Sequence, residues 1–352
     1  MAGPHGRRAD RRHGHRRRRH HGTTWARLTA PTGGGTAIGQ DVATTTHVGE
    51  RYTFTAWARS ADGTPATARI RLAPKVGSTP PAADAGTFAD VALGATWTQV
   101  SASVDVYATG SGLRATIASL TPDVAIDVDD ASLLRSPAFA PFPSWDDFVA
   151  RQRFDLTGSP GTLEDRQATV DALSSWSLTP TAYIQRLMRG SWFGGHVAPV
   201  SRLYRAYFGR VPDYGGATYW AGKHRGGMRL RNISQAFATS SEYQRTYGSL
   251  DDAGFLDQVY RSVLGRPADP QGQAYWTAKM AKGFPRGEVM VAFSESSEYV
   301  RTSAAWVNTF EVYAGMLGRA PTADEQTAGA TLPTYLVIDG VRRSPEYLAR
   351  VA

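Results

Sequence analysis

The side chains best suited to bind a ligand surround a tryptophan on one predicted strand. Trp57 and Arg59 alternate with apolar residues along residues 52–59, so both belong to the polar face of that strand. Neighbouring strands contribute further charged side chains, namely Arg69, Arg71 and Asp127. A flat ring beside charged groups can hold a sugar, because C–H groups stack on the ring and guanidinium groups donate to hydroxyls. In the alternative interpretation, Trp57 packs under a loop and the arginines form solvated ion pairs.

Three acids near the end of the last predicted strand offer oxygen ligands for a cation. Asp127, Asp129 and Asp130 form this cluster, and calcium is held in proteins by such oxygens. We therefore consider a structural calcium ion bound by Asp129 and Asp130, with no cofactor required elsewhere. The alternative is a solvated strand end. Asp213 and Asp269 lack the further acids of a calcium-binding loop, so we expect both to cap helices.

No catalytic residue is identified. The chain has no cysteine, which excludes disulfides and thiolate catalysis. Beyond residue 22 the histidines are His47, His196 and His224, and each is isolated in the sequence. No nucleophile elbow, phosphate loop or dinucleotide fingerprint is present. A pair of carboxylates that cleaves a glycosidic bond leaves no spacing signature, so a carbohydrate-active enzyme remains the alternative to a non-catalytic protein.

The positive charge is confined to the start of the chain. Residues 1–22 contain eight arginines and one aspartate, which give +7 of the net charge of +8. The other 330 residues are nearly neutral, so the folded part lacks the basic face that nucleic-acid binding requires. We expect residues 1–22 to be a disordered tail. It is either a segment that binds polyanions or metal through His13, His15, His20 and His21, or a mis-assigned start that hides a signal peptide.

Strand periodicity dominates residues 23–136. Apolar and polar residues alternate along 52–59, 99–106 and 126–129, as expected of antiparallel strands with one buried face. Such strands predict a β-sandwich of the jelly-roll type. A Pro-rich linker is expected at residues 137–144, followed by an all-α domain of repeated helical units at 145–352. No run of about 20 apolar residues is present, so no membrane span is expected.

The helical part contains an internal repeat. An offset of 56 residues separates Gly209 from Gly265, Trp220 from Trp276, Phe237 from Phe293 and Tyr243 from Tyr299. Repeats of this length indicate stacked helical units. Each unit is expected to end one helix at the glycine, to bury the pairs Tyr219-Trp220 or Tyr275-Trp276, and to begin a last short turn at Ser-x-Glu-Tyr. Weaker copies surround Gly158 and Gly318.

The strand motifs resemble a known family of binding modules. Residues 49–59, Trp97-Thr98-Gln99-Val100 and residues 128–133 resemble, in the right order, strands of jelly-roll carbohydrate-binding modules of the family four/nine type. The resemblance implies a galactose-binding-like fold, a polysaccharide or glycan as the ligand, and a structural calcium near the closing strand. The family's opening strand would fall in the Arg/His tail, so this fold is either closed differently or truncated.

The helical motifs resemble a second family. Leu264-Gly265-Arg266-Pro267, Tyr275-Trp276 and Ser297-Glu298-Tyr299 resemble repeats of the bacterial Domain of Unknown Function family 4214, which implies a helical module on exported multi-domain proteins with no assigned catalysis. The leading hypothesis is a non-catalytic extracellular or cell-surface protein that binds glycan. The alternatives are an accessory part of a glycoside hydrolase, or a structural protein whose helical units associate with one another or with a protein partner.

Overall fold

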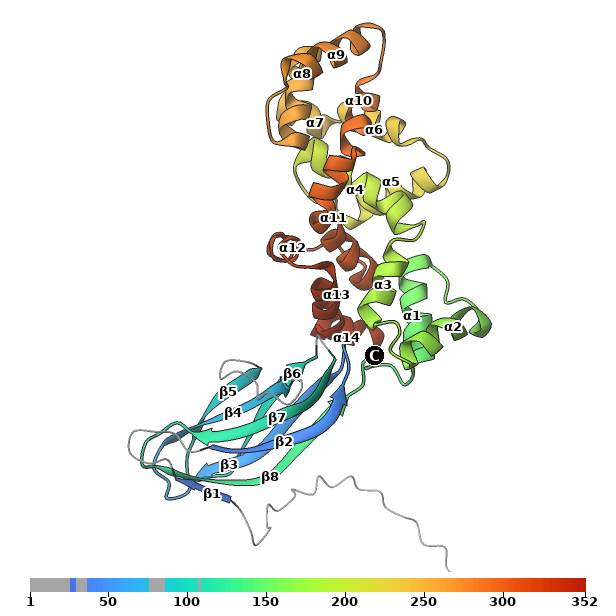
Figure 1. Cartoon of the computed structure of the whole chain (residues 1–352). Coiled ribbons are helices and arrows are strands. Elements are labelled where there is room, and N and C mark those ends of the chain that lie inside the picture. The colour runs from blue at the N-terminus through green and yellow to red at the C-terminus, as the bar shows by residue number, and fades with distance from the viewer. Residues whose placement is uncertain (1–25, 30–36, 76–85, 107–108) are drawn as a thin grey trace, which may run out of the picture. The chain divides into compact units, whose positions relative to one another are not determined.

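The computed structural model describes residues 26–29, 37–75, 86–106 and 109–352. The chain divides into two units, residues 1–136 and 137–352. Within the described residues, strands lie in the first unit and helices in the second (Figure 1). No helix in these ranges is long and apolar enough to cross a bilayer.

Two antiparallel sheets of four strands form the first unit. The strands described are β1 (Ala26–Thr29), β2 (Ala37–Thr46), β3 (Arg51–Ser60), β4 (Ala66–Lys75), β5 (Thr87–Leu93), β6 (Thr98–Asp105), β7 (Gly110–Ser119) and β8 (Ala125–Ser136). One sheet has the order β1-β8-β3-β6 and is called the β3 sheet; the other has the order β2-β7-β4-β5 and is called the β4 sheet. Strands β2, β3 and β4 therefore alternate between sheets, as in the double Greek key of a jelly roll. The predicted antiparallel β-sandwich followed by an all-α part is confirmed.

Alternation along each strand creates the two faces of each sheet. On β3, Tyr52, Phe54, Ala56 and Ala58 are buried in the core between the sheets, while the residues between them are half-buried on the outer face. The turn after β3 contains Gly63 at φ 84°, and the carboxylate of Asp62 accepts from the backbone N–H of Thr64 at 2.9 Å. This is the tight turn that Asp-Gly favours.

The first described strand lies beside the last one. Ala26 pairs with Val128 and Thr29 with Ala125, so β1 covers only the start of β8. The opening strand expected in the Arg/His tail lies outside the described residues. Among the described residues, the stretch of β8 from Asp129 onward has no strand on this side.

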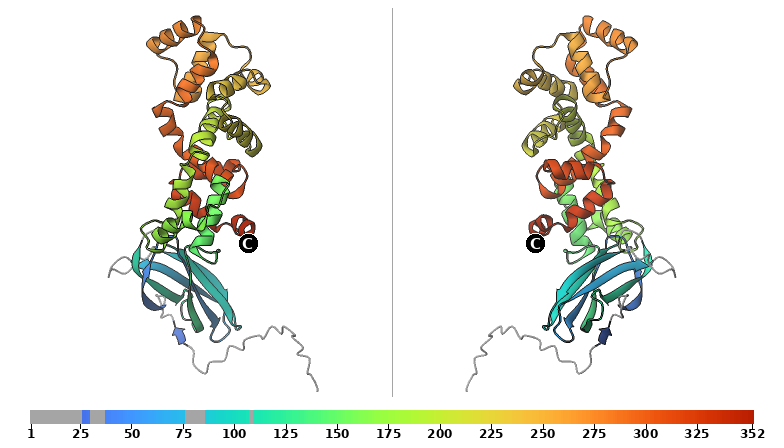
Figure 2. Two further views of the ribbon diagram at one scale, coloured as in Figure 1. Left: turned by 90° about the vertical axis from the view of Figure 1, so that its right-hand side faces the viewer. Right: turned by 90° about the vertical axis from the view of Figure 1, so that its left-hand side faces the viewer.

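Short helices joined by tight turns build the second unit. Their bounds are α1 (Trp145–Thr157), α2 (Leu163–Ser174), α3 (Pro180–Met188), α4 (Ala198–Phe208), α5 (Tyr214–Arg225), α6 (Leu230–Ala238), α7 (Ser241–Tyr247), α8 (Asp252–Val259), α9 (Pro270–Ala281), α10 (Arg286–Ser294), α11 (Ser297–Leu317), α12 (Ala323–Ala330), α13 (Thr334–Arg343) and α14 (Pro345–Val351). Two π-helical turns, η1 (Phe193–Val197) and η2 (Tyr260–Leu264), adjoin α4 and α8. Figure 2 shows these helices, coloured green to red, from two further sides.

The two clear repeats pack the same three rings together. In the first, Tyr204 and Trp220 lie 4.8 and 5.5 Å from Phe237, measured between ring centroids. The corresponding distances to Phe293 in the second repeat are 4.9 and 5.4 Å, from Tyr260 and Trp276. Asp213 and Asp269 cap α5 and α9, as expected, by accepting from the N–H groups of Gly216 and Gly272.

The expectation that both members of each Tyr-Trp pair are buried was wrong for the tyrosines. Tyr219 and Tyr275 are 56% and 53% exposed, whereas Trp220 and Trp276 pack against the core. Successive residues on an α-helix are about 100° apart, so two adjacent side chains cannot both face the core squarely. The pair Tyr219-Trp220 nevertheless has the same surroundings in its repeat as the pair Tyr275-Trp276 has in the other.

The ends of the helical unit pack together in a second core. Phe148 of α1, Ile184 of α3, Phe310 of α11 and Ile338 of α13 belong to this cluster. The Pro-rich segment 137–144, expected to be a linker, adds Phe139 and Phe142 to it, and the carbonyl of Ala138 accepts from Arg342.

Helix α11 connects the two cores. Tyr299, near its start, lies in the core of the repeats, and Phe310 lies in the second core. The second Ser-x-Glu-Tyr therefore begins this 21-residue helix rather than the short turn that we expected. Figure 1 shows α11 between α10 and α13.

The repeated glycines predict a position-specific stability effect. Gly265 ends its helix in the left-handed region at φ 67°, and a Cβ there would touch no atom within 4 Å. We expect Gly265→Ala to lower the free energy of unfolding by about 1–2 kcal/mol, through backbone strain alone. Urea unfolding followed by circular dichroism at 222 nm measures this change in the free energy of unfolding.

The matched control is Gly222→Ala within α5, where space is equally open but φ is not positive. It should stabilise the helix by about 0.5–1 kcal/mol. Equal effects of the two changes would contradict the role given to the left-handed position.

Candidate functional site

The outer face of the β3 sheet places Trp57 among polar side chains. Because Phe54, Ala56 and Ala58 face the core, Trp57 faces outward, and it is half-buried there. Its direct cross-strand neighbours are Gln99 on β6 and Asp129 on β8. Cross-strand neighbours on one face lie within side-chain contact distance. An aromatic ring with an amide on one side and a carboxylate on the other is thus built into this face.

Hydroxyl groups continue this polar band along the same face. Thr55 and Ser132 are hydrogen-bonded at 2.7 Å, and Thr53 and Ser103 at 2.9 Å. Both pairs join adjacent strands and hold their side chains in defined orientations. Together with Trp57, Gln99 and Asp129, these four residues form what we call the Trp57 face.

Asp127 holds the arginines at one end of the Trp57 face. Its side chain is fully buried and accepts from Arg27 Nε at 2.8 Å and from Arg59 Nη2 at 3.1 Å. Burial by itself raises the pKa of this carboxyl, but the hydrogen bonds and charges of the two arginines outweigh burial and lower the pKa. Arg59 also lies over the ring of Trp97, 4.6 Å from its centroid. Asp127 is therefore engaged in positioning Arg59 beside Trp57.

Arg69 and Arg71 lie on the other sheet. Both belong to β4, whose outer face is separated from the Trp57 face by the core. Arg69 forms two hydrogen bonds with Asp90 at 2.7 Å and stacks on Phe88, while Arg71 is paired in register with Phe88. The sequence-based grouping of five residues is thus corrected: Trp57, Arg59 and Asp127 come together, and the other two do not join them. Strands β3 and β4 are adjacent in sequence but lie in different sheets, which periodicity alone does not indicate.

The proposed calcium ligands form no cluster with Asp127. A β-bulge interrupts the pairing of β3 and β8 between Thr55 and Trp57, and Asp130 in this region has φ 47°. Its backbone N–H donates to Asp129 at 2.8 Å, whereas Asp127 is held by arginines. No group of three or more His, Asp or Glu side chains suited to a metal ion occurs in the described part of the chain. The geometry gives the calcium hypothesis no support.

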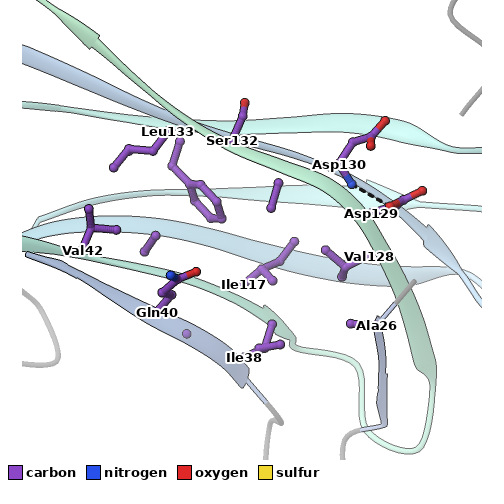
Figure 3. A pocket seen from close by; sticks show the side chains of 14 residues that line it. Ala26, Ile38, Gln40, Val42, Ile117, Val128, Asp129, Asp130, Ser132 and Leu133 are labelled. Carbon is purple, nitrogen blue, oxygen red and sulfur yellow. Dashed lines mark hydrogen bonds between the residues drawn. The ribbon is translucent and has the colours of Figure 1, made fainter. Parts of the chain in front are cut away.

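A cleft opens between the two sheets beside the Trp57 face. Its volume is about 660 Å³, and its apolar walls include Ile38, Val42, Ile117, Phe54 and Leu133. Figure 3 shows Ile38 and Gln40 reaching it from β2 and Val128 and Leu133 from β8. Asp129 and Ser132 line it too, so these residues belong to both the cleft and the Trp57 face. Ile38 is 46% exposed at the start of β2, where the first five residues are all exposed, and β1 covers only the start of β8. No sequence pattern marked this opening.

The helical unit brings two histidines together that the sequence separates. The Nδ1 atoms of His196 and His224 are 3.3 Å apart, and the rings meet edge to face. Burial, followed by the charges of His224 and Arg225, lowers the pKa of His196. The interpretation of these histidines as isolated was wrong, because α5 folds back against η1.

A buried carboxyl in α11 has no hydrogen-bond partner for one of its oxygens. Glu311 is 4% exposed, its Oε1 is unpaired, and it lines a pocket of about 210 Å³ together with Arg202. Burial raises the pKa of Glu311 to about 8, and the charge of Arg202 opposes this rise. Arg202 itself binds Glu295 through two hydrogen bonds. No sequence motif marked Glu311.

The comparisons with known proteins match both parts of the chain. Residues 234–303 match a family described as a domain of unknown function, DUF4214. Over these residues, the helical repeats resemble that family as their motifs indicated. None of the curated proteins matches the chain.

Several solved structures are similar to this chain. A family 16 carbohydrate-binding module is 18% identical, with 32% of this chain and 78% of that one covered and a TM-score of 0.23. A structure described as a CBM4 is 17% identical, covering 31% and 81%, with a TM-score of 0.24. The CBM22-1 xylan-binding domain of Paenibacillus barcinonensis Xyn10C is 14% identical, covering 31% and 91%, with a TM-score of 0.21. Both families that the motifs resembled thus occur among the matches.

The buried carboxylate of Asp127 should stabilise the sandwich. Asp127→Asn leaves Arg27 and Arg59 without their shared charged acceptor, and we expect the free energy of unfolding of this unit to fall by about 1.5–3 kcal/mol. Hydrogen exchange of peptides from β3 and β8, read by mass spectrometry, measures the free energy of unfolding of this unit alone.

Asp90→Asn is the control, because Asp90 also binds an arginine through two bonds but is 38% exposed. Its effect should stay below about 1 kcal/mol. A larger loss for Asp90→Asn than for Asp127→Asn would contradict this account.

Glu311 should make the helical unit less stable as pH rises. Its pKa is about 8 in the folded state and about 4.3 when unfolded, so the folded state holds the extra proton between these values. The free energy of unfolding should then fall with pH across this window, by up to about 1.4 kcal/mol per unit. Glu311→Gln should remove this slope.

The relevant measurement is the difference between the wild type and Glu311→Gln in urea unfolding from pH 5 to 9, which cancels other titrating groups. We expect the variant to gain relative stability toward pH 8. A difference that is constant with pH would show that Glu311 titrates normally.

Proposed function

We propose that the sandwich binds a polysaccharide or glycan at the Trp57 face. The observation that carries this proposal is the indole of Trp57 with Gln99 and Asp129 as its direct neighbours on either side. A sugar presents C–H groups on one face and hydroxyls around its rim. The ring takes the C–H face by stacking, while the amide both donates and accepts and the carboxylate accepts.

The neighbouring side chains are already ordered for this task. Arg59 is held between Asp127 and Trp97, and the hydroxyls of Thr55 and Ser132 are fixed on each other. Side chains that are immobilised before binding lose little conformational entropy on contact with a ligand, and this favours affinity. Arg59 supplies the guanidinium donors and Trp57 the stacking surface.

The adjoining cleft extends the site beyond one sugar unit. Asp129 and Ser132 belong to both surfaces, so a ligand chain on the Trp57 face reaches the cleft across β8. The apolar walls of the cleft accept C–H faces or an apolar substituent, and Gln40 provides a polar contact among them. A longer glycan therefore has a continuous path on this unit.

We assign the protein to the cell surface or the extracellular space, as a non-catalytic binder whose helical unit is an interaction module. Support for the interaction module comes from the tyrosines that both repeats expose at equivalent positions, Tyr219 and Tyr275. Each has a lysine over its ring, Lys223 at 5.4 Å and Lys279 at 4.8 Å. Paired aromatic and cationic groups at a fixed spacing suit a second protein or another copy of this chain.

Trp57→Ala tests the glycan site. The full-length protein is assayed against cellulose, xylan, chitin, mannan, galactan and mixed-linkage glucan by pull-down and affinity electrophoresis. For any glycan bound, we expect Trp57→Ala to weaken the affinity at least about tenfold, which is 1.4 kcal/mol, and Trp57→Phe to retain most of it. Melting curves confirm that the variants fold.

The control is Phe88→Ala, because Phe88 is 56% exposed on the outer face of the opposite sheet. It should leave binding unchanged. Loss of binding in Phe88→Ala but not in Trp57→Ala would move the site to the β4 sheet, and no binding to any glycan would contradict the proposal. Release of reducing ends from a polysaccharide would favour the glycoside hydrolase alternative.

A further inference from the structure

The two histidines of the helical unit are positioned like ligands of one metal ion. His196 lies in the π-helical turn η1 and His224 in the last turn of α5. Their Nδ1 atoms are 3.3 Å apart. In a tetrahedral zinc site with Zn–N distances of about 2.0–2.1 Å, two ligand nitrogens are about 3.3–3.4 Å apart. The observed separation therefore equals the bite of a two-histidine chelate.

We propose that His196 and His224 bind a transition-metal ion of the Zn²⁺, Ni²⁺ or Cu²⁺ class through their Nδ1 atoms. In the absence of metal the same two atoms share one proton in a hydrogen bond. When a metal ion binds, the ring that holds this proton on Nδ1 changes to its Nε2–H tautomer, so two neutral imidazoles bind the ion without net proton loss. Imidazole nitrogens suit these ions, whereas calcium and magnesium prefer oxygen ligands. The remaining coordination positions are left to water or to a ligand.

The repeat shows that the fold does not need a histidine here. At the offset of 56 residues, Met280 of α9 stands where His224 stands in α5, and it is buried in the core of the repeats. An apolar side chain is therefore accepted at this position of the unit. The histidine pair is an addition specific to the first repeat rather than a part of the shared packing.

The local backbone distinguishes this place as well. In η1 the N–H of Val197 bonds to the carbonyl of Trp192 at 3.1 Å, which is the wider π-type turn. Such turns interrupt α-helices mostly as single bulges and are frequent at functional sites. The ring of Trp192 lies 6.3 Å from that of His196, and Arg225 lies over Trp192 at 5.6 Å. The positive charge of Arg225 repels a bound cation and so limits the affinity for metal. The indole of Trp192 lies close enough to report metal binding by its fluorescence.

The experiment measures metal binding in the full-length chain. Residues 1–22 contain His5, His13, His15, His20 and His21, so these five are replaced by Asn in the reference protein, which retains three histidines. Zn²⁺ is titrated calorimetrically, and Cu²⁺ is titrated while tryptophan fluorescence is recorded. We expect about one equivalent of either ion to bind, with quenching by Cu²⁺ that is reduced in Trp192→Phe.

His196→Asn and His224→Met should each abolish the binding of this equivalent. The second variant copies the residue found in the other repeat, so it should keep the melting temperature of the metal-free protein. His47→Asn, in the sandwich, is the control and should bind metal as the reference does. The proposal is overturned if the reference protein binds no Zn²⁺, or if His224→Met binds it equally well.

Discussion

A single buried carboxylate ties three strands of the β3 sheet together. Arg27 on β1 and Arg59 on β3 both converge on Asp127 of β8. A charge that is fully removed from water is tolerated only when it is paired, so Asp127 requires that β1 and β3 flank β8. This requirement also fixes Arg59 over Trp97 and next to Trp57. The ion pairs that hold the sheet thus also position Arg59 at one end of the proposed ligand-binding face.

The helical unit depends on a different constraint, which is the burial of rings at repeated positions. Each clear repeat packs one tyrosine and one tryptophan against one phenylalanine. The glycine and aspartate that flank these rings end one helix and begin the next, so they set where the rings can lie. The arginine after the glycine adds a link, since Arg210 binds Glu242 and Arg319 binds Glu346. The Gly-Arg and Ser-x-Glu-Tyr motifs are therefore joined by ion pairs in two of the units.

These two constraints leave different positions open to binding residues in the two units. On the sandwich, outward side chains of β3, β6 and β8 share one face, and their types are free once the core positions are apolar. In the helices, sites arise where a residue departs from the repeat, as His224 does relative to Met280. Glu311 is a different case, because it is a buried carboxyl without a partner for one of its oxygens, and such a group opposes stability.

The sequence by itself determined the local features of this protein. Alternation fixed which residues of β3 face the core, Gly209 and Gly265 marked helix ends, and Asp213 and Asp269 marked helix starts, because each depends only on residues a few positions away. Only the tertiary structure decided which strands share a sheet, so Arg69 and Arg71 were grouped wrongly with Trp57. It also decided that His196 meets His224 and that a cleft opens beside β8. Those features depend on pairings between residues far apart in the chain, and no local period or propensity records such pairings.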